Sequence, residues 1–134
     1  MSQLPTTPPA AGPRGGIWGL GFSSASTAVL ARLQQAGLVD GHVGPHDQPA
    51  PRDYLLREWS SASAFVVVGA CGLVTRLIAP LLSSKDRDPA VVVVDPEGRF
   101  AIPLLGGHAA GAEQLSQRVA ASLGGQAVLT GATA

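Results

Sequence analysis

Cysteine, aromatic residues and runs of one charge are all scarce in this chain of 134 residues. Cys71 is the only cysteine, which excludes an internal disulfide and a cysteine-rich metal cage. The formal net charge is zero and no run of lysine or arginine occurs, so we do not expect binding to nucleic acid through neutralised phosphates. Aromatic residues make up 4% of the chain, which is too few for a base-stacking platform.

Long hydrophobic runs are also missing. The longest apolar and glycine stretch, residues 64–74, is too short to span a bilayer, and no basic segment followed by an apolar stretch marks a signal peptide. We therefore expect a cytoplasmic protein. Because 46% of the residues are hydrophobic, the chain can form one sizeable core, in which Cys71 is interpreted as a buried, inert thiol rather than a reactive one.

Two regions are rich in proline or glycine. Residues 1–14 contain four prolines and little to bury, which predicts a disordered leader ahead of a single α/β domain over residues 15–134. Residues 38–52 read as a loop that carries His42 and His46. Two histidines can ligate a metal, but no third ligand lies nearby in the sequence, so we predict a solvated loop and no metal site.

Buried runs alternate with helical patterns along the rest of the chain. We expect strands at residues 17–22, 64–69, 89–95, 99–102 and 127–130, and helices from the serines at 23–26 to Gly37, at 53–59, at 73–81 and at 108–123. The runs at 64–69 and 89–95 are continuously apolar, as in a parallel sheet that is covered on both faces. The pattern predicts an α/β fold, a Rossmann-like three-layer sandwich with a mostly parallel sheet.

Glycine turns between strands and helices are the candidate binding elements. Gly69, Ala70 and Gly72 lie in one such turn, and Gly106 and Gly107 lie in another, directly before His108. Free N–H groups at a helix start attract anions, and a histidine titrates near neutral pH. The simpler interpretation is a tight turn with His108 as a helix cap.

Ligands of open parallel sheets bind beyond the carboxyl ends of the strands, so we hypothesise that both turns form one cradle there. Residues 99–102 are expected to pair antiparallel with the preceding strand, however, and the turn at Gly106 would then face the other edge.

Several charged residues allow two interpretations. Arg76, one turn into a predicted helix, is either a partner for a ligand carboxylate or a surface arginine in an ion pair. Asp95, at a strand end, is either a turn former or a functional carboxylate. The alternating charges of residues 85–88 predict a solvated loop. Glu113 is expected to stabilise a helix start through the helix dipole.

The stretch from Gly69 to Thr133 resembles the N-terminal domain of cobalt-precorrin-5A hydrolase, an enzyme of cobalamin biosynthesis. The resemblance rests on the segments Gly69–Arg76, Ile78–Leu82, Asp88–Asp95, Leu104–His108 and Gly111–Ala112, together with Lys85, Gly98 and Leu115. It covers about half of the chain, and residues 15–32 resemble the opening strand and helix of the family more weakly.

The resemblance implies hydrolytic opening of the δ-lactone of cobalt-precorrin-5A with release of acetaldehyde. The substrate carries its own cobalt and several carboxylates, so no separate metal or cofactor is implied. His108 would be the catalytic base or would orient the substrate. Main-chain N–H groups of Gly69, Ala70, Gly72, Gly106 and Gly107 would bind carboxylates or an oxyanion, and Arg76 would pair with a carboxylate.

The resemblance also allows a function without catalysis. The chain would then be a tetrapyrrole-binding or docking module, the front part of a fusion with a precorrin-3B C17-methyltransferase. The expected partners in either case are a corrinoid intermediate and other domains of the same enzyme, and neither nucleic acid nor a membrane.

Overall fold

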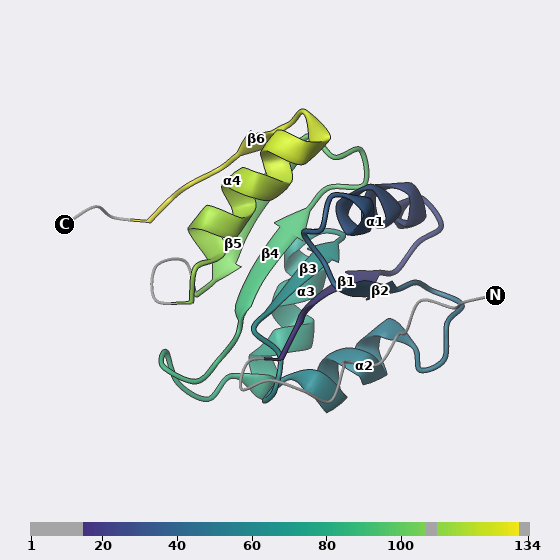
Figure 1. Ribbon diagram of the computed structural model, residues 1–134. Coiled ribbons are helices and arrows are strands. Elements are labelled where there is room, and N and C mark those ends of the chain that lie inside the picture. Colours follow the sequence, from purple (N-terminus) through teal and green to yellow (C-terminus); the bar gives the residue numbers. More distant parts are fainter. Residues whose placement is uncertain (1–14, 107–109, 132–134) are drawn as a thin grey trace.

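A six-stranded sheet organises the chain in the computed structural model, which describes residues 15–106 and 110–131 (Figure 1). The strands lie in the order β2-β1-β3-β4-β5-β6. Four neighbouring strands are parallel: β2 (Gly41–Val43), β1 (Ile17–Gly21), β3 (Ala64–Val68) and β4 (Ala90–Val94). The strand β5 (Phe100–Leu105) runs antiparallel to β4, and β6 (Gln126–Ala127) runs parallel to β5. The predicted α/β class and mostly parallel sheet are confirmed.

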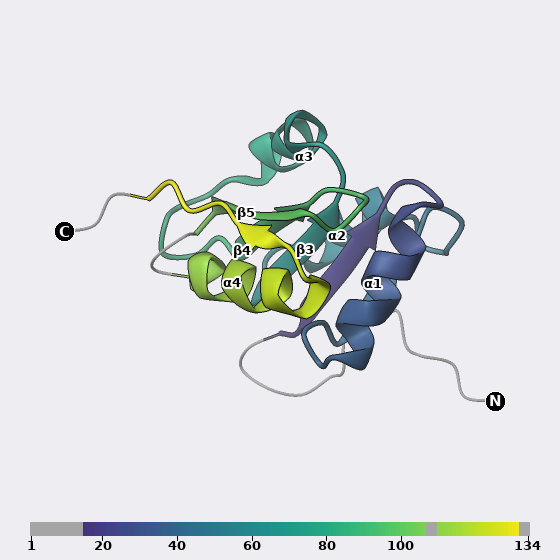
Figure 2. The same ribbon diagram turned by 90° about the horizontal axis from the view of Figure 1, so that it is seen from above.

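Helices cover both faces of the sheet (Figure 2). The helices α1 (Ser26–Gln35) and α4 (Ala112–Leu123) pack on one face, and α2 (Pro51–Glu58) and α3 (Cys71–Ile78) pack on the other. The short 3-10 helix η1 (Ala79–Leu81) follows α3. Successive residues of a strand point to opposite faces, so the continuously apolar runs of β3 and β4 contribute to both cores. This is the three-layer arrangement expected from the sequence.

The helices in the described part of the chain are short. The longest is α4, with 12 residues. Within residues 15–106 and 110–131, no helix has both the length and the apolar character needed to cross a membrane.

Several boundaries differ from the sequence prediction, among them that of the last strand, expected at 127–130 and found as the two-residue β6. The strand β2 lies inside the region expected to be a loop, so His42 is a strand residue. The helix α2 begins at Pro51 rather than at residue 53, because proline suits the first helical position, where its missing N–H costs nothing. The helix α4 begins at Ala112 rather than at residue 108, because Gly111 has a φ of 83°, which is not helical.

The charged loop before β4 is held by hydrogen bonds to one of its residues, Asp88. Lys85, Asp86 and Arg87 are exposed, as expected of a solvated loop. Asp88 is half-buried, and its side chain forms hydrogen bonds. Its carboxylate accepts the Ser83 N–H at 2.9 and 3.0 Å and the Trp59 indole N–H at 3.3 Å. Asp88 therefore joins this loop to the end of α2.

Candidate functional site

The strand order reverses between β1 and β3, because the chain goes from β1 outward to β2 and then returns to β3 on the other side of β1. In open α/β sheets the crevice at such a reversal, beyond the carboxyl ends of the strands, is the usual ligand site. Two segments follow those ends here: residues 22–25, which lead into α1, and residues 69–70, which lead into α3.

The turn at Gly69 is open to a ligand. Its first N–H donates to the Val94 carbonyl at 2.9 Å, which fixes the turn against the end of β4. Ala70 and Gly72 are exposed, and a Cβ added at Gly72 would meet nothing within 4 Å. The first N–H groups of a helix have no intrahelical partners, and at the start of α3 no capping side chain accepts from them.

Arg76 lies one turn further along α3. Its side chain is exposed, and it forms no ion pair with any residue that the structure describes. Of the two interpretations of Arg76, the surface ion pair is therefore absent from the described part of the chain.

The structure does not bring Gly106 to this turn. The register pairs Leu105 with Val91, at the start of β4, and a Cβ at Gly106 would lie 3.2 Å from the Ala90 Cα. The strand β4 separates this amino-terminal edge from the Gly69 turn by about 13 Å, at about 3.3 Å per residue. The hypothesis of one cradle formed by both turns is therefore wrong for Gly106, and the antiparallel alternative is confirmed. Gly107 and His108 lie outside the described residues.

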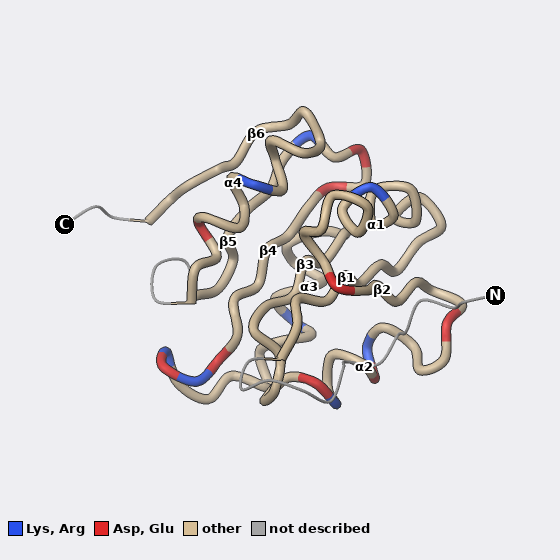
Figure 3. Tube along the Cα trace, viewed as in Figure 1, with Lys and Arg blue, Asp and Glu red and all other residues tan. Residues whose placement is uncertain are grey.

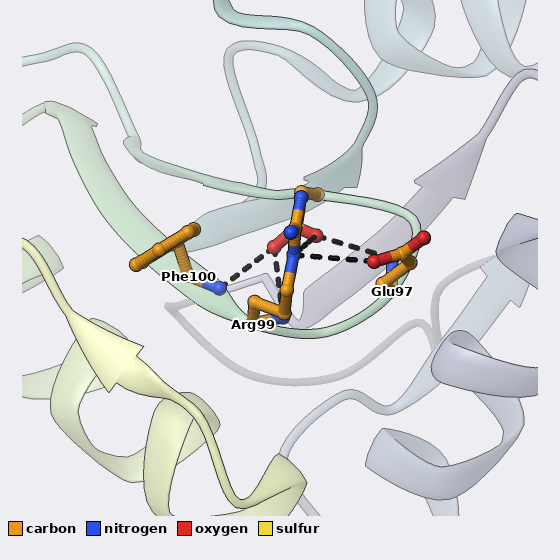
Figure 4. Close-up of polar contacts among 4 residues, drawn as sticks. Glu97, Arg99 and Phe100 are labelled. Atoms are coloured by element: carbon orange, nitrogen blue, oxygen red, sulfur yellow. Dashed lines mark hydrogen bonds and ion pairs between the residues drawn. The ribbon is translucent and has the colours of Figure 1, made fainter.

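Asp95 is a turn former (Figure 4). Its carboxylate accepts the N–H groups of Glu97, Arg99 and Phe100 at 3.2, 2.8 and 2.7 Å, and the Arg99 Nε–H at 3.2 Å. Burial raises the pKa of Asp95, but these hydrogen bonds outweigh that effect and hold the pKa below its ordinary value. The carboxylate is occupied by the β4–β5 connection, and this settles the choice that the sequence left open.

A depression of about 270 Å³ lies at the same edge of the sheet as the Gly69 turn, between the start of α1 and the loop after β2. Ser24 and Thr27 line it from the helix side, and His42, His46 and Asp47 line it from β2 and the loop. The Asp47 carboxylate accepts the Gly44 N–H at 2.7 Å, which holds the loop closed on itself.

His42 is half-buried at the wall of this depression. Its Nδ1 lies 2.7 Å from Oε1 of Gln34 on α1. Burial lowers the pKa of His42, and the Asp47 carboxylate offsets this only in part, so the neutral ring is favoured. An amide oxygen can only accept, so Nδ1 carries the hydrogen and Nε2 keeps a lone pair.

Sequence reasoning missed this arrangement. The strand that carries His42 has three residues, and the contact with Gln34 joins two elements that no short motif links. Within residues 15–106 and 110–131, no group of three or more histidine, cysteine, aspartate or glutamate residues is placed to hold a metal ion.

Comparisons with known proteins concern mainly the second half of the chain. The family model for the cobalamin synthesis G N-terminal region matches residues 53–134. Two curated relatives, both called cobalt-precorrin-5A hydrolase, are 44% identical (Salmonella typhimurium) and 41% identical (Priestia megaterium) over 75 residues, or 56% of this chain. The matched stretch is 21% and 20% of their lengths, so it spans about a fifth of each relative.

A solved structure agrees with the fold. The crystal structure of a cobalamin biosynthesis protein G homolog from Sulfolobus solfataricus has a TM-score of 0.71 and 26% sequence identity. The match covers 86% of this chain and 36% of that one, so it extends well beyond the 75 residues of the sequence matches.

Proposed function

The chain belongs to the cobalamin synthesis G N-terminal family, and on that premise we propose that it takes part in the hydrolytic δ-lactone opening of cobalt-precorrin-5A, with release of acetaldehyde. The observation that carries the proposal is the identity of 44% and 41% to two proteins called cobalt-precorrin-5A hydrolase. Because the matched stretch is about a fifth of those proteins, the remaining regions of the enzyme are expected partners of this chain.

The substrate is proposed to bind at the carboxyl edge of β1 and β3. Main-chain N–H groups of Gly69, Ala70 and Gly72 would hold its carboxylates, and Arg76 would pair with a peripheral one. The open space beside Gly72 supports this placement, as does the guanidinium of Arg76, which pairs with no carboxylate in the described part of the chain. No cofactor or resident metal is required, because the substrate brings its own cobalt.

His108 is proposed as a general base or substrate-orienting group, with the N–H groups of Gly106 and Gly107 holding an oxyanion. Gly106 lies at the amino-terminal edge, so these residues would contact a part of the substrate different from the part held by the Gly69 turn.

Incubation with cobalt-precorrin-5A tests the proposal. Acetaldehyde release by this chain, alone or together with the remaining regions of a relative, is the expected result, and its loss in His108→Ala would assign the residue. Release that is unchanged in His108→Ala would remove that residue from the mechanism, and no release under either condition would sink the proposal.

A second function is a non-catalytic tetrapyrrole-binding or docking module, with catalysis in another domain such as a fused precorrin-3B C17-methyltransferase. The observation that favours it is the small share of the relatives that this chain matches. Binding of the corrinoid without turnover by this chain would support this second function over the first.

Gly72→Ala separates ligand binding from folding. Gly72 is in the first turn of α3, and an added methyl group meets nothing within 4 Å, so we expect stability to rise by about 0.5 kcal/mol. If carboxylates approach this turn closely, the methyl group blocks them, and corrinoid affinity should fall about tenfold. Thermal unfolding and an absorbance titration measure the two effects.

The remaining proposals concern the binding partners and the cellular location of the protein. Charges of both signs are spread over the chain (Figure 3), which suits neither nucleic acid nor an anionic membrane surface as a partner. A place in the cytoplasm remains part of the proposal.

A further inference from the structure

We infer that His42 is the general base that activates water for attack on the lactone carbonyl, with Gln34 as its positioning residue, which leaves His108 the substrate-orienting role of the two proposed above. This inference rests on the proposed function, because it names the base at the carboxyl edge of the sheet. If the lactone lies at the edge where the Gly69 turn holds the substrate, it needs a proton acceptor there, and His42 lines the depression at that edge. Gly106, in the other candidate turn, lies at the opposite edge.

The contact with Gln34 fixes the state of the ring. With Nδ1–H donated to the amide oxygen at 2.7 Å, the free lone pair is on Nε2. A base whose other nitrogen is held by an acceptor is the arrangement used to orient a catalytic imidazole. The second histidine of the depression, His46, is exposed and has no such partner among the described residues.

The depression has the size and lining for a small ester and a water. Its volume of about 270 Å³ exceeds that of several waters, each of which takes about 30 Å³ in the liquid. The hydroxyl groups of Ser24 and Thr27 can donate to an ester oxygen. The titratable groups that line it besides His42 are His46 and Asp47. Ser24, before α1, and Thr27, on α1, line it with uncharged side chains, and Gln34 of α1 contacts His42.

The chemical step balances within the depression. The water oxygen bonds to the carbonyl carbon while its proton passes to Nε2 of His42. The tetrahedral intermediate then collapses, the bond from carbon to the ring oxygen breaks with its electron pair, and the leaving oxygen takes the proton back from the imidazolium. The products are a carboxylic acid and a hydroxyl group, and the imidazole returns to its starting state.

Hydrolysis of p-nitrophenyl acetate tests the base without a corrinoid. We expect wild-type protein to release p-nitrophenol, and kcat/KM to fall about tenfold or more in His42→Ala. Gln114→Ala is the control, because Gln114 is exposed on α4 and does not line the depression, so its loss should leave the rate unchanged. His42→Gln serves as a second variant of closer shape, and thermal unfolding confirms that each variant is folded.

The pH profile distinguishes a base from a structural residue. The wild-type rate should rise with pH through a midpoint below 6.5, the ordinary pKa of histidine, and then level off, because burial disfavours the protonated ring. Gln34→Ala should shift that midpoint and lower kcat more than it raises KM. Ester hydrolysis that is absent in wild type, equal in His42→Ala, or governed by a midpoint of 6.5 or higher would overturn the inference.

The two proposals fail separately. If cobalt-precorrin-5A yields no acetaldehyde while ester hydrolysis still depends on His42, the proposed substrate is wrong and the assignment of His42 as a base stands. Acetaldehyde release that persists in His42→Ala would remove His42 and leave the proposed function.

Discussion

Replacing Asp95 by alanine should lower the free energy of unfolding by about 2 kcal/mol, as urea denaturation would show. The carboxylate accepts three main-chain N–H groups and the Arg99 side chain, all within the connection that turns β4 into β5. Without the carboxylate, those donors can hydrogen-bond only to water, and the tight turn loses the acceptor that holds its N–H groups together. Hydrogen bonds to a charged acceptor contribute about 1.5–3 kcal/mol each when sheltered, and the exposure of this turn reduces that sum.

Glu97→Ala is the matched control in the same turn. Its side chain is 73% exposed and contributes only an ion pair with Arg99 at 3.3 Å, so its loss should change stability by less than about 0.5 kcal/mol. If the two variants unfold at the same urea concentration, the hydrogen bonds of Asp95 do not stabilise the turn.

The pH dependence of the Asp95 effect follows from the direction of its pKa. The folded protein holds the pKa of Asp95 below its ordinary value of 3.8, so the ionised carboxylate is more stable in the folded state than in the unfolded chain. That stability is fully present above 3.8 and is lost as the pH falls through the folded pKa. The difference between wild type and Asp95→Ala should therefore be widest near neutral pH and shrink in acid. A difference that stays constant down to well below 3.8 would contradict this.

The sheet was readable from the sequence because its central strands are buried on both faces. The runs that became β3 and β4 are apolar at every position, a pattern that needs two helical layers and so fixes the fold class. The strand β2 escaped detection because three residues carry too little periodicity. The start of α4 was placed four residues early, since helical spacing does not show that Gly111 takes a left-handed conformation.

The candidate site was harder to predict, because it depends on strand direction. A connection as short as residues 95–99 forces an antiparallel pair, and this one choice sends Gly106 to the edge opposite Gly69. Similarly, the His42–Gln34 contact exists only because β2 runs beside β1 under α1. Residues that attract attention by type, such as glycines before a histidine, say nothing about which edge of a sheet they reach.

Gly106→Ala should lower the free energy of unfolding by about 3 kcal/mol, and this variant tests whether Gly106 packs against the start of β4. Gly106 has a φ of 73°, where an alanine is strained by about 1 kcal/mol. Its Cβ would lie 2.8 Å from the Ala110 Cβ and 3.2 Å from the Ala90 Cα, and such overpacking adds about 2 kcal/mol. The strand β4 and the entry to α4 would have to separate, which should appear as a lower midpoint of thermal unfolding.

Gly111→Ala provides the control that isolates the contact from the backbone strain. Gly111 has a φ of 83°, but an added Cβ meets nothing within 4 Å, so only the conformational cost of about 1 kcal/mol is expected. The excess for Gly106 over Gly111 then measures how tightly the turn is held against the start of β4. Equal losses for the two variants would mean that Gly106 is not packed there, and the separation of the two glycine turns onto opposite edges would have to be reconsidered.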